Sequence, residues 1–134
     1  MQRRIKEIFF SIKPFDRRKS VRFKPQIYIS CFCIYVKSGK KKESPSEIID
    51  VSKDGLLLMT GEDKILPPTE VEICFQLPGR QEIDCIQGKI VRTYRRHTEN
   101  WYYSGIKFTD NQQKGVQSLL DIVIADSRQP KPFL

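Results

Sequence analysis

The chain has 134 residues and a mass of 15.7 kDa, which is the size of one ordinary domain. Hydrophobic residues make up 39% and charged residues 30%, a composition typical of a folded, soluble protein and unlike that of a disordered or membrane-embedded one. No apolar run approaches the ~20 residues of a membrane span, and the apolar stretch at residues 8–12 is too short for a signal peptide. We therefore expect a cytoplasmic protein.

The net charge of +8 is distributed unevenly along the chain. Residues 1–42 contain thirteen Lys or Arg and two acidic residues, whereas residues 43–134 contain eleven basic and fourteen acidic residues. A basic leader on a mildly acidic body is typical of an arm that meets an anion. The charge alone leaves nucleic acid, acidic lipid and a phosphate-bearing ligand as alternatives.

The N-terminal segment has its own pattern. Four apolar residues follow helical spacing and predict a short amphipathic helix over residues 1–13: Ile5, Ile8, Phe9 and Ile12. Pro14 ends this helix, and residues 15–24 form a charged, irregular leader. The first 14 residues are therefore predicted to be an extension of the main domain.

The middle of the chain has the signals of strands. An apolar, β-branched run predicts a long strand over residues 26–36, and the polar residues 37–46 predict a loop. Further strands are predicted over the segments 47–51, 56–60, 71–77, 81–94 and 101–108. Asp54-Gly55 predicts a tight turn in which the glycine has a positive φ, and Gly88 predicts a bulge or a close approach of two backbones.

After the last strand the apolar residues change to helical spacing. The residues of this pattern are Val116, Leu119, Leu120, Val123 and Ile124. Asp110 and Gln113 resemble a capping box that opens this helix, and residues 127–134 are predicted to be a loose tail. Antiparallel strands followed by one helix predict a mostly β domain over residues 15–126, a small barrel whose open end the helix covers.

The four cysteines are Cys31, Cys33, Cys74 and Cys85. Structural zinc sites have two close Cys pairs, and the second pair here is eleven residues apart. A disulfide is disfavoured in a reducing cytoplasm. We therefore expect buried, reduced thiols and no metal site.

Two short motifs contain residues that could bind a ligand. Arg18 and Arg22 form an R-x-x-x-R pattern with Arg17 just before it, although Arg92 and Arg96 repeat that spacing and a solvated basic face would explain either copy. The second motif is D-x-S-x-x-G, made by Asp50, Ser52 and Gly55. A structural turn explains this second motif, because Asp and Ser bond to nearby backbone groups, but it does not explain why the arginine leader precedes it.

Together these motifs resemble the PilZ domain family, as do the segments 88–92 and 105–108 before the closing helix. The resemblance covers roughly residues 15–125. It implies a six-stranded antiparallel β-barrel that acts as a bacterial receptor for cyclic di-GMP, and we expect no further cofactor. Because the charges of such a ligand would bridge the leader and the barrel, we expect binding to order the leader, to move the N-terminal helix and so to signal to an unidentified protein partner.

The resemblance assigns a role to each motif residue. Arg18 and Arg22 grip guanine and phosphate, and Arg17 is the variant that holds a stacked ligand dimer. Asp50 and Ser52 form the barrel wall of the site, and Gly55 permits the turn that aims them outward. The residue types suit such a ligand independently, because the arginine fork matches the O6/N7 edge of guanine and a carboxylate accepts from its N1–H and N2–H.

Other functions remain as alternatives. A basic barrel could bind single-stranded nucleic acid through the leader and Trp101, Tyr102 and Tyr103, although these aromatics are more typical of core and barrel-end packing. A PilZ-like adaptor that has lost its ligand is a third candidate. The predicted helix over residues 1–13 is expected to pack on a protein, with a membrane surface as the less favoured partner. The single histidine, His97, has no catalytic neighbour in the sequence, so an enzyme is not expected.

Overall fold

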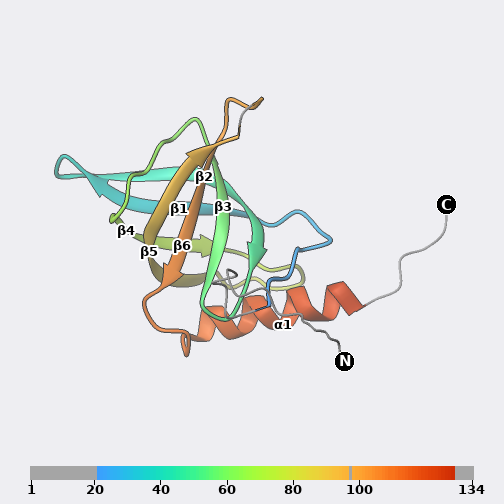
Figure 1. Cartoon of the computed structure of the whole chain (residues 1–134). Helices are drawn as coiled ribbons and strands as arrows, with labels where there is room; N and C mark the ends of the chain where they lie inside the picture. The colour runs from blue at the N-terminus through green and yellow to red at the C-terminus, as the bar shows by residue number, and fades with distance from the viewer. Residues whose placement is uncertain (1–20, 97, 129–134) are drawn as a thin grey trace, which may run out of the picture.

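The computed structural model describes residues 21–96 and 98–128, which form six strands and one helix (Figure 1). The elements are β1 (Ser30–Lys37), β2 (Lys40–Val51), β3 (Gly55–Gly61), β4 (Glu70–Phe75), β5 (Asp84–Arg95), β6 (Tyr102–Phe108) and α1 (Lys114–Arg128). The strands close into an antiparallel barrel in the order β1-β2-β3-β6-β5-β4. The predicted six-stranded barrel with a C-terminal helix is confirmed. The predicted helix over residues 1–13 and most of the predicted tail lie outside the described residues.

Alternation of apolar and polar residues determines what fills the barrel. In β4 the residues Val71, Ile73 and Phe75 point inward and are at most 3% exposed, and the residues between them face out. Leu56 and Leu58 of β3 are fully buried in the same core. Each such side chain stabilises the fold by about 1.5–3 kcal/mol through burial.

The hairpin of β1 and β2 differs from our expectation. Residues 37–46 were predicted to be a loop, but β1 continues to Lys37 and β2 begins at Lys40. The connection is two residues long, and both have positive φ, 54° for Ser38 and 76° for Gly39. This conformation matches the type I′ turn, whose twist suits paired strands, so the predicted loop was wrong.

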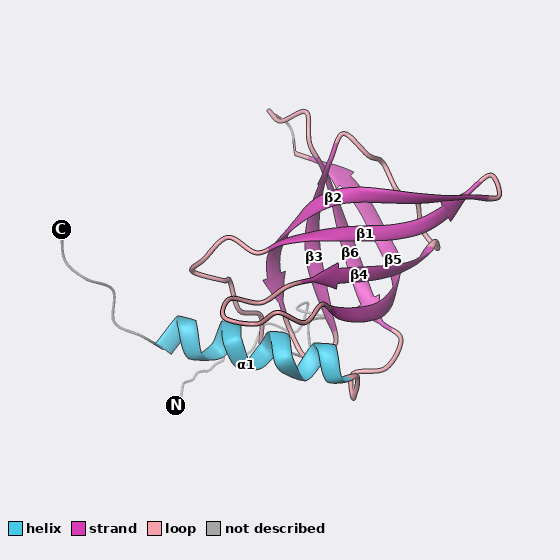
Figure 2. Cartoon of the chain, turned by 180° about the vertical axis from the view of Figure 1, so that it is seen from behind, coloured by secondary structure: helices cyan, strands magenta, loops and turns pink. Residues whose placement is uncertain are grey.

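The helix α1 lies across one end of the barrel, as both views show (Figures 1 and 2). Its apolar residues join the barrel core, with Val116, Leu119 and Val123 fully buried. The predicted capping box is wrong in detail. Gln113 does not bond to the Asp110 N–H; its side chain accepts from the Gln87 N–H and donates to the Gln87 carbonyl, so it ties the start of α1 to β5.

Gly88 has a close neighbour, as predicted. A Cβ added there would lie 2.6 Å from Ile106 Cγ2 and 2.9 Å from the Lys107 carbonyl oxygen of β6. The bulge itself lies further along β5, where the register shifts between Ile90 and Arg92. In the described part of the chain, no helix is long and apolar enough to cross a membrane.

Candidate ligand site

The end of the arginine leader is fixed to the barrel by main-chain hydrogen bonds. Phe23 and Val51 exchange two of them, with N···O distances of 2.8 and 2.9 Å, and so form an isolated antiparallel bridge at the end of β2. Six residues later the Ile29 carbonyl accepts from the Ile48 N–H at 3.0 Å. The segment before β1 therefore runs beside the end of β2, where the D-x-S-x-x-G motif begins.

This path brings Arg22 onto Asp50. Arg22 Nε donates to Asp50 Oδ1 at 2.7 Å, and Arg22 Nη2 lies 2.5 Å from the same oxygen. The two side chains keep 26% and 14% of their surface exposed, so the pair lies at the rim and not in the core. Charge-assisted bonds of this kind are about twice as strong as neutral ones. The pair links the first motif to the second across 28 residues of sequence.

Ser52 is oriented differently from our expectation. It is 1% exposed, and its Oγ accepts from the N–H groups of Asp54 and Gly55, each at 3.3 Å. The Ser52 N–H donates to the Gly55 carbonyl at 2.8 Å, which closes the turn between β2 and β3. The hydroxyl therefore holds the turn together, and the structural interpretation of the motif is correct for this residue.

Gly55 is needed for a different physical reason from the predicted one. It is not among the glycines with positive φ, which are Gly39, Gly61 and Gly79. A Cβ added at Gly55 would instead lie 2.2 Å from the carbonyl oxygen of Ile106 on β6. The residue must be glycine because β6 passes directly over it, so the prediction of a positive φ was wrong.

Of the six predicted site residues, the described structure places four. Arg22 and Asp50 are in contact, and Ser52 and Gly55 form the turn just beyond Asp50. Arg17 and Arg18 lie outside the described residues. The second R-x-x-x-R pattern has other neighbours: the Arg92 guanidinium carbon lies 5.2 Å from the ring centre of Tyr94, and that of Arg96 lies 4.2 Å from that of Tyr103.

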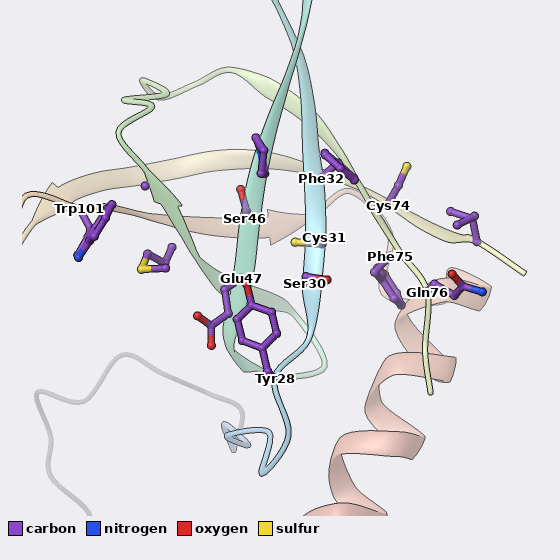
Figure 3. Close-up of a pocket in the computed structure, with 14 residues that line it drawn as sticks. Tyr28, Ser30, Cys31, Phe32, Ser46, Glu47, Cys74, Phe75, Gln76 and Trp101 are labelled. Carbon is purple, nitrogen blue, oxygen red and sulfur yellow. The ribbon is translucent and has the colours of Figure 1, made fainter. Parts of the chain in front are cut away.

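A cavity of about 560 Å³ lies on the barrel wall (Figure 3). Its lining includes Tyr28 and Glu47, which point into the same space, together with Phe32, Phe75 and Trp101. None of the predicted site residues lines it. Sequence reasoning missed this cavity, although the outward position of Glu47, three residues before Asp50 on β2, was a usable signal.

The aromatic residues at the start of β6 have different surroundings. Tyr103 is 4% exposed and stacks on Tyr94 with 5.6 Å between ring centres, so its predicted packing role is confirmed. Trp101 is 45% exposed, so the prediction of a core position was wrong for this residue. It lies just before β6 and lines the cavity.

The cysteines also fall into two pairs. Cys31 and Cys33 point into the core, and burial raises both pKa values, that of Cys33 to about 12. Cys74 is half-buried and Cys85 is exposed, so the prediction of four buried thiols was wrong for the second pair. Loss of solvation and the neighbouring Cys85 sulfur raise the pKa of Cys74 to about 12. Alternation along β4 explains the position of Cys74, because it lies between the inward residues Ile73 and Phe75.

A family model described as "PilZ domain" matches residues 16–125, most of the chain and all six strands. The chain belongs to the PilZ domain family. The predicted resemblance is confirmed, and no curated protein sequence matches the chain.

Solved structures resemble this PilZ domain in fold. The PilZ domain of YcgR from Escherichia coli with c-di-GMP is 14% identical, with a TM-score of 0.64 over 84% of this chain and 93% of that one. The MrkH–c-di-GMP complex of K. pneumonia is 18% identical, with a TM-score of 0.64 over 87% and 55%. The inhibitor of motility MotI/DgrA of Bacillus subtilis is 13% identical, with a TM-score of 0.59 over 85% and 54%. The chain thus spans about half the length of the last two.

Proposed function

We propose that this PilZ domain is a receptor for cyclic di-GMP and not an enzyme. The observation that carries the proposal is the contact between Arg22 and Asp50, which joins the two motifs at one place on the barrel rim. Two of the solved structures of similar fold hold c-di-GMP according to their descriptions. The basic leader supplies the positive charge that a ligand with two phosphodiester groups requires.

The chemistry of the rim residues suits this ligand. Arg22 carries a planar fork of N–H donors, which can meet either the O6/N7 edge of a guanine or a phosphate. Asp50 can accept from the N1–H and N2–H groups of the other guanine edge. The ion pair holds both side chains in place before the ligand arrives, which lowers the entropy lost on binding. Ser52 and Gly55 act by fixing the turn that presents Asp50.

Arg17 and Arg18 complete the proposed site from the leader. Arg18 grips guanine and phosphate together with Arg22, and Arg17 holds a second, stacked ligand molecule. Binding orders the leader against the barrel and so moves the extension over residues 1–14, which passes the signal to a protein partner in the cytoplasm. Trypsin tests this step: cyclic di-GMP is expected to slow cleavage after Arg17, Arg18 and Arg22, and equal cleavage rates with and without the ligand would contradict it.

Calorimetric titration with cyclic di-GMP tests the binding itself. We expect a dissociation constant of about 1 μM or tighter for the wild type. Arg22→Ala should weaken binding by about 10–100-fold, since a bidentate contact contributes about 1–3 kcal/mol. The matched control is Arg92→Ala, which removes one arginine from beside a tyrosine ring elsewhere on the barrel.

Three outcomes are informative. Weakened binding for Arg22→Ala with unchanged binding for the control supports the receptor, and a stoichiometry of two ligands per chain supports the role of Arg17. Absence of binding by the wild type would contradict the proposal and leave the ligand-free adaptor. Binding to single-stranded RNA that falls steeply with salt and is indifferent to Asp50→Ala would indicate the nucleic-acid alternative.

A further inference from the structure

Cys74 of β4 and Cys85 of β5 lie directly opposite each other in the sheet. One hydrogen bond shows which opposite residues of β4 and β5 are hydrogen-bonded pairs: the Ile90 N–H donates to the carbonyl of Thr69, the residue opposite it, at 2.8 Å. Hydrogen-bonded pairs alternate with non-hydrogen-bonded ones along an antiparallel ladder, so counting along the register makes Cys74 and Cys85 a non-hydrogen-bonded pair. At such positions the Cα atoms are about 4.5 Å apart and the side chains are closest, within the range of disulfides.

The two sulfurs are in contact on the outer surface of the barrel. The Sγ–Sγ distance is 2.7 Å. Cys85 is exposed and Cys74 is half-buried beside Phe32, its partner on β1, so reagents in solution can reach the pair (Figure 3). Cys31 and Cys33 face the core instead, at most 5% exposed.

We propose that Cys74 and Cys85 form an oxidation site that closes into a reversible cross-strand disulfide with a small-molecule disulfide such as glutathione disulfide. The Cys85 thiolate attacks one sulfur of the oxidant, forms a mixed disulfide and releases one glutathione thiolate. Cys74 then loses its proton to solvent and attacks the Cys85 sulfur, which releases the second glutathione. Two thiols of the protein are oxidised, and one glutathione disulfide is reduced to two glutathione molecules.

The structure assigns the order of these steps. Cys85 reacts first because it is exposed, whereas Cys74 is protonated at neutral pH. The second step is intramolecular, and the contact between the sulfurs gives it a high effective concentration. Regulatory disulfides of this exposed, reversible kind are the ones that occur in a reducing compartment.

A metal ion is the competing occupant of this place. Glu72 is the third member of a group whose ligand atoms lie within 4.8 Å of one another. Two thiolates that bind one tetrahedral zinc at ~2.3 Å must have sulfurs roughly 3.8 Å apart, farther than these are. The Glu72 carboxylate is also held by Gln87 Nε2 at 2.7 Å. The geometry therefore favours oxidation over chelation.

Oxidation would affect the helix α1, because the start of α1 packs on β5 at Cys85. A Cβ added at Gly115 of α1 would meet the Cys85 carbonyl oxygen at 2.5 Å, so the start of the helix lies on this strand. Gln113, the residue just before α1, binds the main chain of Gln87, two residues after Cys85 on the same strand. A disulfide would connect β4 to the strand on which α1 is seated, and it would constrain the unfolded chain as well.

The experiment uses the full chain, treated with a tenfold molar excess of glutathione disulfide, alkylated and digested with trypsin. Arg80 lies between the two cysteines, so the peptides 65–80 and 81–89 stay joined only if the disulfide has formed. We expect that linked peptide, a loss of two of the four thiols, reversal by dithiothreitol, and a rise in Tm of about 5–10 °C. Cys85→Ser should show none of these changes, and the exposed position of this residue favours normal folding of the variant.

Several results would overturn the proposal. One is a glutathione adduct at Cys85 that persists without closing, and another is a linked peptide that contains Cys31 or Cys33. A third is equimolar zinc that binds and protects Cys74 and Cys85 from both oxidation and alkylation, with loss of that binding in Cys85→Ser. None of these outcomes depends on ligand binding, so the redox site and the proposed receptor function are tested separately.

Discussion

Gly55→Ala tests how closely β3 and β6 approach each other at the motif turn. The added Cβ would lie 2.2 Å from the Ile106 carbonyl oxygen and 3.4 Å from Lys107 Cα. Ordinary van der Waals contact begins at about 3.4 Å, so one backbone must move by roughly 1 Å. The obstacle is a main-chain oxygen within the β3–β6 ladder, where Leu56 pairs with Ile106, so no side-chain rotation relieves the clash.

Overpacking of this kind lowers the free energy of unfolding by about 1–3 kcal/mol. We expect Gly55→Ala to lower it by about 3 kcal/mol, because a backbone atom cannot move aside as a side chain can. Urea unfolding followed by circular dichroism measures it. The matched control is Gly39→Ala, at φ 76° with nothing within 4 Å, which bears only the left-handed strain of about 1 kcal/mol. A loss for Gly55→Ala no larger than that of Gly39→Ala would refute the reasoning from close approach.

Two further predictions concern the core. Loss of solvation and the charge of Asp63 raise the pKa of the Cys33 thiol to about 12. The stability that this neutral thiol contributes is therefore intact below pH 9 and is lost as the pH rises from 9 toward 12. Above pH 9, the free energy of unfolding of the wild type should fall with pH about 1.4 kcal/mol per pH unit more steeply than that of Cys33→Ala. Urea denaturation at several pH values measures this, and equal slopes for the two proteins would contradict the prediction. Leu58→Ala should cost about 2–5 kcal/mol because Leu58 is fully buried, whereas Leu66→Ala, at 55% exposure, should stay within about 0.5 kcal/mol by thermal unfolding. Equal effects of the two leucine substitutions would contradict the assigned core.

Most of the fold could be predicted where side chains alternate between core and solvent. The residues of β4 show this period clearly, and the helical spacing in α1 is equally clear. The start of β2 could not be found this way, because Lys40 to Ser46 is polar on both faces. Ser44 and Ser46 occupy its inward positions, where they are buried and bonded to other polar groups. The usable signal was the Ser38-Gly39 pair, a two-residue hairpin turn.

The sequence predicts which residues form the candidate site, but it does not predict the contacts that bring them together. The sequence predicts that Arg22 and Asp50 belong to one site, and they are in contact. It could not predict the main-chain bridge from Phe23 to Val51 that makes this contact, because hydrogen bonds between backbones leave no trace in side-chain identity. The outward pair of Cys74 and Cys85 depends on the strand register, which the sequence alone leaves open.

The D-x-S-x-x-G motif combines a structural turn with a presented carboxylate, and the two interpretations apply to different residues. Ser52 and Gly55 are buried, and their requirements are set by the turn bonds and by β6. Asp50 lies at the rim and meets Arg22. Variants of Ser52 or Gly55 should therefore lower stability and ligand affinity together, because both depend on the shape of the turn. Asp50→Asn should separate the two effects, since a rim ion pair stabilises a fold by about 1 kcal/mol or less while the carboxylate remains essential to the proposed guanine contact.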